Sequence, residues 1–315
     1  MQNSRTQSTD GGSSPTPPIQ FHSKNTLDPD LREYYNRNHA IARKRYEEDR
    51  SKCYQRVVRE LYDQIEPRER LEFNGTARVE RITRDQAASI ILKYEWLAGD
   101  PTNKAPLGRA IEAYYGLFLN GELIGANCLG HCGGQQGNIC GSEFSKQTVC
   151  LHRGATVHYA PIHAGSFLTA HTCRQAYKDL DWRCFYAYSD AAANEVGVIY
   201  YTCKWYYLGK DLGRGEGSFH IDFVSPDGKE RLTSHAINKK SKCVRELTGW
   251  DESKGRIRPY MRDAGWKPIK VYGKGKWCTF FGSKPQKAEL KAACRYRLDL
   301  PRPRRNSSGV ETEDE

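Results

Sequence analysis

The stretch Tyr114-Tyr-Gly-Leu-Phe-Leu-Asn-Gly-Glu-Leu-Ile-Gly-Ala126 decides the fold of this chain. Its two apolar runs are separated by Asn120-Gly121. Asn-Gly in this position is typical of a two-residue type I′ turn, whose twist matches that of paired strands. Residues 114–119 and 122–126 are therefore predicted to form a β-hairpin.

Further strands and helices alternate on both sides of this hairpin. Before it, Thr83 and Gln86 have the spacing of a capping box, which predicts a helix that reaches Leu97. After it, apolar residues recur with helical spacing over 164–180 and 189–205. The other apolar runs predict strands over 78–82, 148–157, 182–188 and 205–208. This order predicts a mixed α/β domain with one hairpin and βαβ units.

Composition narrows the class of protein. The chain has 315 residues, of which 38% are hydrophobic and 28% are charged, and its mean hydropathy is −0.78. No stretch approaches the roughly 20 apolar residues that a membrane span needs. The segment Met1–Lys24 also lacks the apolar region of a secretory signal. We therefore expect a cytoplasmic protein without a membrane partner.

The number and spacing of the cysteines also indicate a cytoplasmic protein. There are eleven, an odd number spread along the chain, which argues against a disulfide framework. The one cluster contains Cys128, Cys132, Cys140 and Cys150, and its spacing is wider than that of the paired CxxC motifs of zinc sites. These residues are expected to be ordinary strand and loop cysteines, and a metal site is the alternative that stays open.

Positive charge is concentrated in the C-terminal third. Residues 204–305 contain 25 Lys and Arg against 11 Asp and Glu, whereas the last ten residues contain four acidic residues. Such a region favours a polyanionic partner, most often nucleic acid, over a merely solubilising surface. Aromatic residues that could stack on bases are interleaved with these charges: Tyr260, Trp266, Tyr272, Trp277, Phe280 and Phe281.

These patterns divide the chain into five expected segments. They are a disordered tail (1–27), a charged helical segment (28–72, with one long helix over 28–66), a catalytic core (73–210), a basic nucleic-acid-binding extension (211–300) and a disordered tail that is first basic and then acidic (301–315).

Several stretches together resemble one known family. They are Ile91–Leu97, Tyr115–Gly125, Ala164–Leu168, Tyr206–Gly209 and above all Tyr188-Ser-Asp-Ala-Ala-Ala-Asn-Glu-Val-Gly-Val-Ile-Tyr200. With them the chain resembles the GNAT-type acyltransferase fold and, within it, the Mom-type adenine modification proteins of bacteriophages. The resemblance covers about residues 77–240, and more loosely extends to 300. It implies a GNAT-like mixed central sheet with flanking helices, in addition to the long N-terminal helix and the basic C-terminal extension.

The resemblance also implies an activity. The family forms a carbamoylmethyl group on adenine N6 in phage DNA, which blocks host restriction, and the cytoplasm would then be that of the host. Two other functions stay open: a non-catalytic DNA-binding protein, and an N-acyltransferase that acts on a protein or a small molecule. A methyltransferase is disfavoured, because no strand is followed by a glycine-rich nucleotide loop.

Four residues are the expected catalytic groups. Asp190, between a strand and a helix, would accept a proton or hold the base, and the alternative is a helix N-cap. Tyr200 would donate or relay a proton, and the alternative is a core aromatic. Ser166, near a helix N-terminus, would help to receive an anion or only cap the helix. Tyr94 matches an aromatic position of the family and would stack on a flipped base.

Double-stranded DNA is the expected partner. The residues expected to contact it are Lys93, Lys239, Lys240, Lys274 and Lys276. The group donor stays open between an acyl-CoA and an aminoacyl donor such as a charged tRNA. At the expected CoA loop the chain reads Tyr159-Ala-Pro-Ile-His-Ala-Gly-Ser166, in which most of the glycines are missing and Pro161 removes an amide donor.

Overall fold

A computed structural model describes most of the chain. The described residues are 21–22, 26–73, 75–96, 107, 110–131, 138–211, 219–305 and 311–312. Much of the two tails expected over 1–27 and 301–315 lies outside them. Two short antiparallel pairs are described there: β1 (Phe21–His22) with β2 (Thr26–Leu27), and β13 (Arg304–Arg305) with β14 (Glu311–Thr312).

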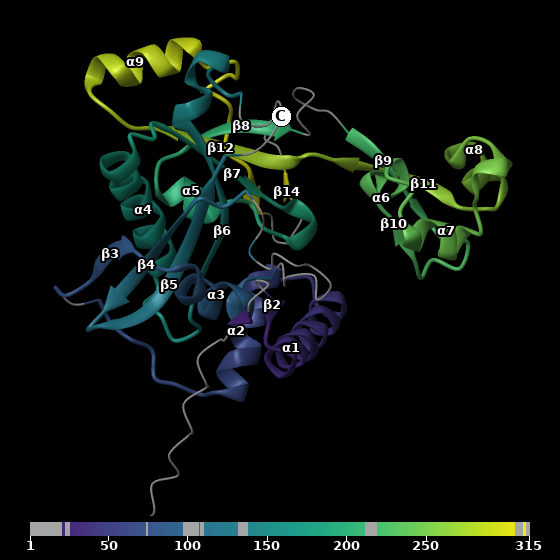
Figure 1. Ribbon diagram of the computed structural model, residues 1–315, viewed down its shortest axis with the longest axis horizontal. Helices are drawn as coiled ribbons and strands as arrows, with labels where there is room; N and C mark the ends of the chain where they lie inside the picture. Colours follow the sequence, from purple (N-terminus) through teal and green to yellow (C-terminus); the bar gives the residue numbers. More distant parts are fainter. Residues whose placement is uncertain are drawn as a thin grey trace, which may run out of the picture.

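A seven-stranded mixed sheet forms the centre of the molecule (Figure 1). Its strands, in spatial order, are β3 (Arg78–Arg81), β4 (Ala113–Leu119), β5 (Glu122–Gly130), β6 (Thr148–Thr156), β7 (Cys184–Ser189), β12 (Lys274–Phe280) and β8 (Tyr206–Asp211). Every neighbouring pair is antiparallel except β6 and β7, which are parallel. The expected mixed α/β fold is confirmed.

The predicted hairpin is β4 and β5. Asn120 and Gly121 both have positive φ, 51° and 85°, as a type I′ turn requires, and Leu119 pairs with Glu122 directly beside them. The capping box at Thr83 and Gln86 is also confirmed, and it begins α3 (Arg84–Tyr94). This helix ends before Leu97, which lies outside the described residues.

Helices cover both faces of the sheet. Tyr115 donates a hydrogen bond to Asp179, and Asn127 donates one to Thr172, both on α4 (Ala164–Leu180). The next residue of β5, Cys128, lies instead near Glu95, at the end of α3. Because successive strand residues point to opposite faces, α3 and α4 cover opposite sides of the sheet.

The expected single helix over residues 28–66 is two helices. They are α1 (Pro29–Glu48) and α2 (Tyr54–Ile65), and the Ser51 N–H bonds to Asp49 in the polar turn between them. The break lets the aromatic rings of Tyr46 and Tyr54 meet at 5.1 Å. The two helices pack on the outer side of α3, where the ring of Tyr62 lies 5.2 Å from that of Tyr94.

The expected helix over residues 189–205 is also interrupted. A 3-10 turn (Ala191–Ala193) is followed by a short α5 (Val198–Thr202). Gly197 between them has φ of 79°, and a Cβ at this position would lie 2.5 Å from the indole nitrogen of Trp277. Close packing against this buried tryptophan therefore holds the chain in a conformation that ends the first turn. Further 3-10 turns cover Ser142–Gln147 and Glu252–Lys254.

The basic C-terminal region is not one extension. Strand β12 lies between β7 and β8, so it completes the core that was expected to end at 210, and α9 (Lys284–Ala293) follows it. Between β8 and β12 the chain forms a separate small lobe, residues 219–272, which we call the insert lobe. Its elements are β9 (Phe219–Val224), β10 (Arg231–Leu232), α6 (Ser234–Asn238), α7 (Lys242–Thr248), α8 (Ile257–Asp263) and β11 (Lys267–Tyr272).

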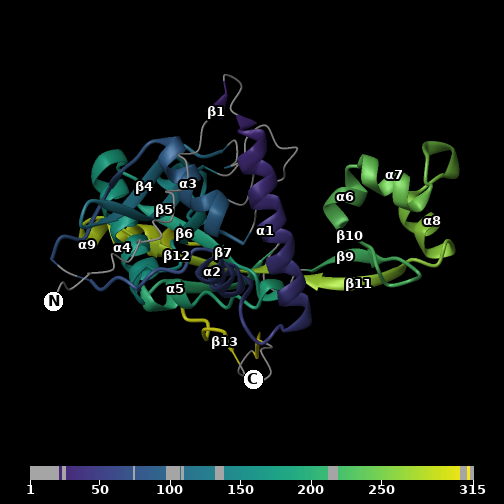
Figure 2. The same ribbon diagram turned by 90° about the horizontal axis from the view of Figure 1, so that it is seen from below.

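The insert lobe has its own sheet and its own core. The strands pair in the order β10-β9-β11, and the apolar core contains Phe223, Leu232, Ile237, Val244, Met261 and Trp266. Figures 1 and 2 both show the lobe at one side of the molecule, joined to the central sheet by extended strands. None of the helices in the described part of the chain has the length and apolar composition of a membrane span.

Candidate functional site

The parallel strands β6 and β7 separate toward their carboxyl ends. Their residues pair from Thr148 with Cys184 to Cys150 with Tyr186, and within the described residues the pairing stops there. Strand β6 continues to Thr156 against β5, and β7 continues to Ser189 against β12. The carboxyl ends of neighbouring parallel strands are where α/β folds place functional side chains.

Asp190 follows β7 at this opening. Its Oδ2 lies 2.9 Å from Nζ of Lys274, the first residue of β12, and the aspartate side chain is 18% exposed. Its backbone carbonyl accepts hydrogen bonds from the N–H groups of Ala193 and Glu195. The backbone thus fixes the turn while the carboxylate faces Lys274. Lys274 also lies over the ring of Trp96, 6.0 Å from its centroid.

A second ion pair lies nearby and is buried. Nη1 of Arg153, on β6, lies 2.9 Å from Oε2 of Glu95, which directly follows α3. The two atoms are within ion-pair distance, but they do not have the alignment of a hydrogen bond. Burial raises the pKa of Glu95 to about 7, against the opposing effects of Arg153, the Gly154 N–H and Lys274. The charge of Lys274 lies close enough to Glu95 to lower its pKa, so the two ion pairs lie in one region.

Tyr200 projects from α5 toward this region. Its ring packs 5.0 Å from that of Trp205 and 5.9 Å from that of Trp277, so it is also part of the core that the sequence suggested. Burial raises its pKa above the usual range, and the negative charges of Glu195 and Glu95 act in the same direction. A phenol carries its proton at neutral pH in any case, and burial makes this one a weaker acid.

Ser166 lies in the first turn of α4, close to α5. Its hydroxyl donates a hydrogen bond to the His163 carbonyl, and its own carbonyl accepts one from the thiol of Cys203. The N-cap position of α4 is His163, so Ser166 is not the cap of this helix. The structure thus brings the start of α4, which carries Ser166, beside the short helix that carries Tyr200.

Two other predicted site residues are buried away from solvent. Tyr94 is 3% exposed and packs against the rings of Tyr62 and His158. Nζ of Lys93 lies 2.6 Å from Glu66. A flipped base has no open ring face on Tyr94 to stack on, so the predicted stacking and DNA-binding roles of this pair do not fit their positions.

Of the other predicted DNA-binding lysines, one is buried and three are exposed. Lys276 is completely buried and donates a hydrogen bond to the Tyr296 hydroxyl at 2.9 Å, so a direct phosphate contact does not fit its position. Lys239 and Lys240 are exposed in the insert lobe, and Lys240 pairs with Glu252 at 3.4 Å. Lys274 is half-exposed and lies in the site itself.

The cysteine cluster of the sequence is divided between two parts of the core. Cys128 belongs to the cluster beneath α3, whereas Cys140 and Cys150 belong to the cluster that also contains Cys184. Cys132 lies outside the described residues. Within the part of the chain that the structure describes, no three His, Cys, Asp or Glu side chains are arranged to hold a metal ion.

Four positions just before and at the start of α4 cannot donate a backbone N–H to a CoA pyrophosphate. Binding of a pyrophosphate needs several backbone N–H groups that point toward one spot. Here the N–H groups of Val157, Ala160 and Ala164 bond to carbonyls of the chain itself, and Pro161 has none. The carbonyls of Val157 and His158 accept hydrogen bonds from Arg59, which packs α2 against this segment.

The sequence analysis missed Glu95 and Arg153. Glu95 shares the stretch Ile90–Trp96 with Lys93, and Arg153 follows His152 in Thr148–Thr156, so no single polar exception marked either residue in the sequence. Their pairing could not be read from the sequence, since they lie on elements far apart in the chain.

Comparison with known proteins identifies one family. No curated protein matches the chain. The model of the Mom protein family, in contrast, matches residues 76–258, which include α3, the central hairpin, Asp190, Tyr200 and most of the insert lobe. This match extends over more than half of the chain, and the chain therefore belongs to the Mom protein family.

Proposed function

We propose that this chain is an enzyme that adds a carbamoylmethyl group to N6 of adenine in phage DNA and so protects the DNA from host restriction. The family is associated with bacteriophage DNA modification, which supports a DNA substrate. The single observation that carries the proposal is the Asp190–Lys274 ion pair where β6 and β7 separate. Tyr200 packs on Trp277, whose indole N–H donates a hydrogen bond to Ser189, the residue before Asp190.

Adenine N6 is a weak nucleophile, because its lone pair is delocalised into the ring. A catalyst must orient the amine, accept a proton from it and stabilise charge that develops on the electrophile. In the proposed reaction Asp190 accepts this proton. The nearby ammonium group of Lys274 orients the carboxylate and stands between it and the exposed surface.

Two further groups have complementary roles in the proposal. Tyr200 supplies a proton to the leaving group, since a phenol carries its proton at neutral pH. The guanidinium of Arg153, held by Glu95 in a buried position, stabilises negative charge on the electrophile, because charges interact more strongly in a dry site.

The proposed donor is an aminoacyl ester such as a charged tRNA. Within residues 157–163, Val157 and Ala160 use their N–H groups in bonds to the chain itself and Pro161 has none, which favours this donor over acyl-CoA. The basic surface of the chain is suited to a nucleic acid. Attack of N6 on the carbonyl carbon of a glycyl ester would form the N–C bond, break the ester C–O bond and release the tRNA hydroxyl. The resulting N6-glycyl group is an isomer of the carbamoylmethyl group, so a rearrangement must follow this transfer.

Nucleoside mass spectrometry tests the proposal. Plasmid DNA is taken from cells that express the wild-type chain, Asp190→Ala or Asp85→Ala, an exposed carboxylate in the first turn of α3. We expect a deoxyadenosine heavier by one carbamoylmethyl group with the wild type and Asp85→Ala, and none with Asp190→Ala. Full modification by Asp190→Ala would refute its role. Unmodified DNA in cells that accumulate folded wild-type protein would contradict the reaction itself.

A further inference from the structure

The surface of the insert lobe is rich in exposed cations. Four of its lysines are held by acidic neighbours: Lys229 by Asp227, Lys240 by Glu252, Lys242 by Glu246 and Lys254 by Asp251. Five further cations are exposed and, among the described residues, lie outside ion-pair distance of any Asp or Glu. They are Lys239, Arg245, Arg256, Arg262 and Lys267. These five are available to a polyanion.

Most of the aromatic side chains that the structure describes in the lobe are covered. Trp250 and Trp266 are buried, and the hydroxyl of the partly buried Tyr260 bonds to the Thr248 carbonyl. The side chain of Tyr272 lies outside the described residues. The base stacking expected of Trp266 therefore does not fit its position, and the hydroxyl of Tyr260 is already engaged. Proteins that bind single strands rely on exposed rings, whereas a surface of cations alone suits the phosphates of a duplex.

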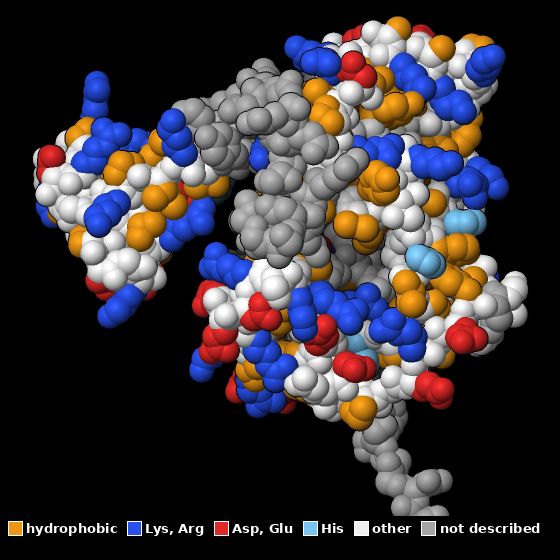
Figure 3. Space-filling model, turned by 180° about the vertical axis from the view of Figure 1, so that it is seen from behind, with side chains coloured by type: hydrophobic (Ala, Val, Ile, Leu, Met, Phe, Trp, Pro, Cys, Tyr) orange, Lys and Arg blue, Asp and Glu red, His pale blue; other side chains and the backbone are white. Residues whose placement is uncertain are grey.

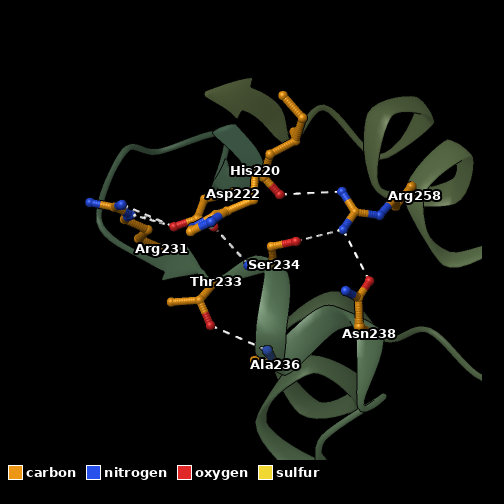
Figure 4. A network of polar contacts seen from close by, with 9 residues as sticks. His220, Asp222, Arg231, Thr233, Ser234, Ala236, Asn238 and Arg258 are labelled. Carbon is orange, nitrogen blue, oxygen red and sulfur yellow. Dashed lines mark hydrogen bonds and ion pairs between the residues drawn. The ribbon is translucent and has the colours of Figure 1, made fainter. Parts of the chain in front are cut away.

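A network of polar contacts joins β9, α6 and α8, the strand and helices next to which several of these cations lie (Figure 4). The guanidinium of Arg258, on α8, donates hydrogen bonds to the Ile221 carbonyl, to Ser234 Oγ and to Asn238 Oδ1. It thereby ties α8 to both β9 and α6.

Asp222 forms the other half of the network. It is 1% exposed, accepts a hydrogen bond from the Ser234 N–H at 2.7 Å and forms an ion pair with Arg231 at 2.9 Å. Nε2 of His220 lies 3.2 Å from the same carboxylate. Arg231 and Arg258 therefore tie β10 and α8 to β9 and α6, and three of the five cations, Lys239, Arg256 and Arg262, lie on or directly beside α6 and α8.

The connection of the lobe leads directly to the candidate site. Strand β11 pairs with β9 as far as Tyr272, Gly273 follows, and Lys274 then begins β12 and pairs with Asp190. Figure 3 shows the lobe, with many Lys and Arg side chains, standing apart from the main body with open space beside it. A duplex bound to the lobe would therefore be held next to Asp190.

We propose that the insert lobe is a docking module for double-stranded DNA, which it grips by the phosphate backbone through Lys239, Arg245, Arg256, Arg262 and Lys267. This inference rests on the proposed function, in which duplex DNA is the substrate. It adds that binding is located in the lobe and not in the equally basic segment around α9.

Fluorescence anisotropy of a labelled 20-base-pair duplex tests the proposal with the full-length chain. The test variant is Arg245→Ala with Arg262→Ala. Its matched control is Lys284→Ala with Lys287→Ala, two exposed cations on α9. Figures 1 and 2 both place α9 at the other end of the molecule from the lobe. All four positions are exposed, so both variants are expected to keep the wild-type thermal stability.

We expect the lobe variant to bind the duplex roughly tenfold more weakly at low salt. The slope of log affinity against log salt should fall by about two, since about one is lost for each phosphate contact. The α9 variant should bind like the wild type, and unlabelled duplex should compete better than single-stranded DNA or tRNA.

Three results would overturn this docking role. They are equal weakening by both variants, wild-type binding by the lobe variant, and stronger competition by a single strand or by tRNA. The measurement needs neither donor nor reaction. Lobe-dependent binding without any modified nucleoside would refute the proposed function alone, and modification with lobe-independent binding would refute the docking role alone.

Discussion

The catalytic core and the insert lobe use charged residues in opposite ways. In the core, Glu95 and Arg153 are buried as a pair, and Asp190 is mostly buried beside Lys274. In the lobe, the tryptophans are buried and cations such as Arg245 and Arg262 are exposed. Burial strengthens the interactions of a charge and perturbs its pKa, whereas exposure leaves it free to meet phosphates. In the proposed function, the buried charges of the core serve the reaction and the exposed cations of the lobe serve binding.

The two regions also differ in the size of their cores. The central sheet is covered by helices on both faces, and its apolar clusters include many completely buried side chains. The lobe has a single cluster of six buried residues. Because stability depends on buried apolar area, the lobe should unfold locally with a lower free energy than the core.

The largest expected effect is a loss of DNA modification without a loss of duplex affinity. Tyr200→Phe removes only the hydroxyl and should lower modification by roughly 10²–10⁴-fold, the usual contribution of a general acid. Duplex affinity should stay within about twofold, since the cations of the lobe are untouched. Nucleoside mass spectrometry and anisotropy measure the two quantities.

Tyr201→Phe is the matched control for this prediction. Tyr201 is the next residue of α5, but it is 54% exposed and its ring lies beneath Arg302. It should modify DNA like the wild type. Equal losses in both variants would mean that α5 acts through its packing and not through the Tyr200 hydroxyl.

The second prediction tests whether the lobe is a separate unit. Phe223 is completely buried in the lobe, and Phe223→Ala should lower the local free energy of unfolding by about 3–5 kcal/mol. Hydrogen exchange should then lose protection within residues 219–272 alone, and duplex affinity should fall. Phe185→Ala, in the core of the central sheet, should instead expose the whole core. Loss of protection throughout the chain in Phe223→Ala would show that the two regions unfold together.

The third prediction concerns the buried carboxyl group of the core. The pKa of Glu95 is raised from 4.5 to about 7, so the native state binds this proton more tightly than the unfolded state does. Its contribution is therefore fully present below pH 4.5 and is lost as the pH rises through about 7, by about 3 kcal/mol in total. Urea unfolding between pH 4.5 and 8 should show this loss in the wild type and not in Glu95→Gln. Parallel pH profiles would contradict it.

Local signals predicted much of the fold. The Asn120-Gly121 hairpin and the capping box at Thr83 depend on neighbouring residues, and both are confirmed. The position of Asp190 directly after a strand was likewise visible in the sequence. Such features need only the chemistry of a few adjacent residues, so a single sequence contains them.

Long-range packing decided the features that were not predicted. Gly197 interrupts the expected helix because it packs against Trp277, a residue of β12 that is distant in the sequence. The basic composition around Lys274 and Lys276 suggested an extension, although β12 is an inner strand of the main sheet. The two ion pairs of the site join residues that only this topology brings together. Charge alone does not distinguish a buried lysine from an exposed one.

The smallest expected effect compares one helix cap from each region. Thr83 caps α3 in the core, and Thr233 caps α6 in the lobe by accepting a hydrogen bond from the Ala236 N–H, as Figure 4 shows. Replacing either threonine by alanine removes one cap and should lower helix stability by about 1 kcal/mol.

Thr83→Ala should reduce the free energy of global unfolding, because α3 packs on the central sheet. Thr233→Ala should leave global unfolding unchanged, and should lower only hydrogen-exchange protection in the lobe and duplex affinity. A global loss in both variants would mean that the lobe and the core form one cooperative unit, and that binding and chemistry are not divided between them.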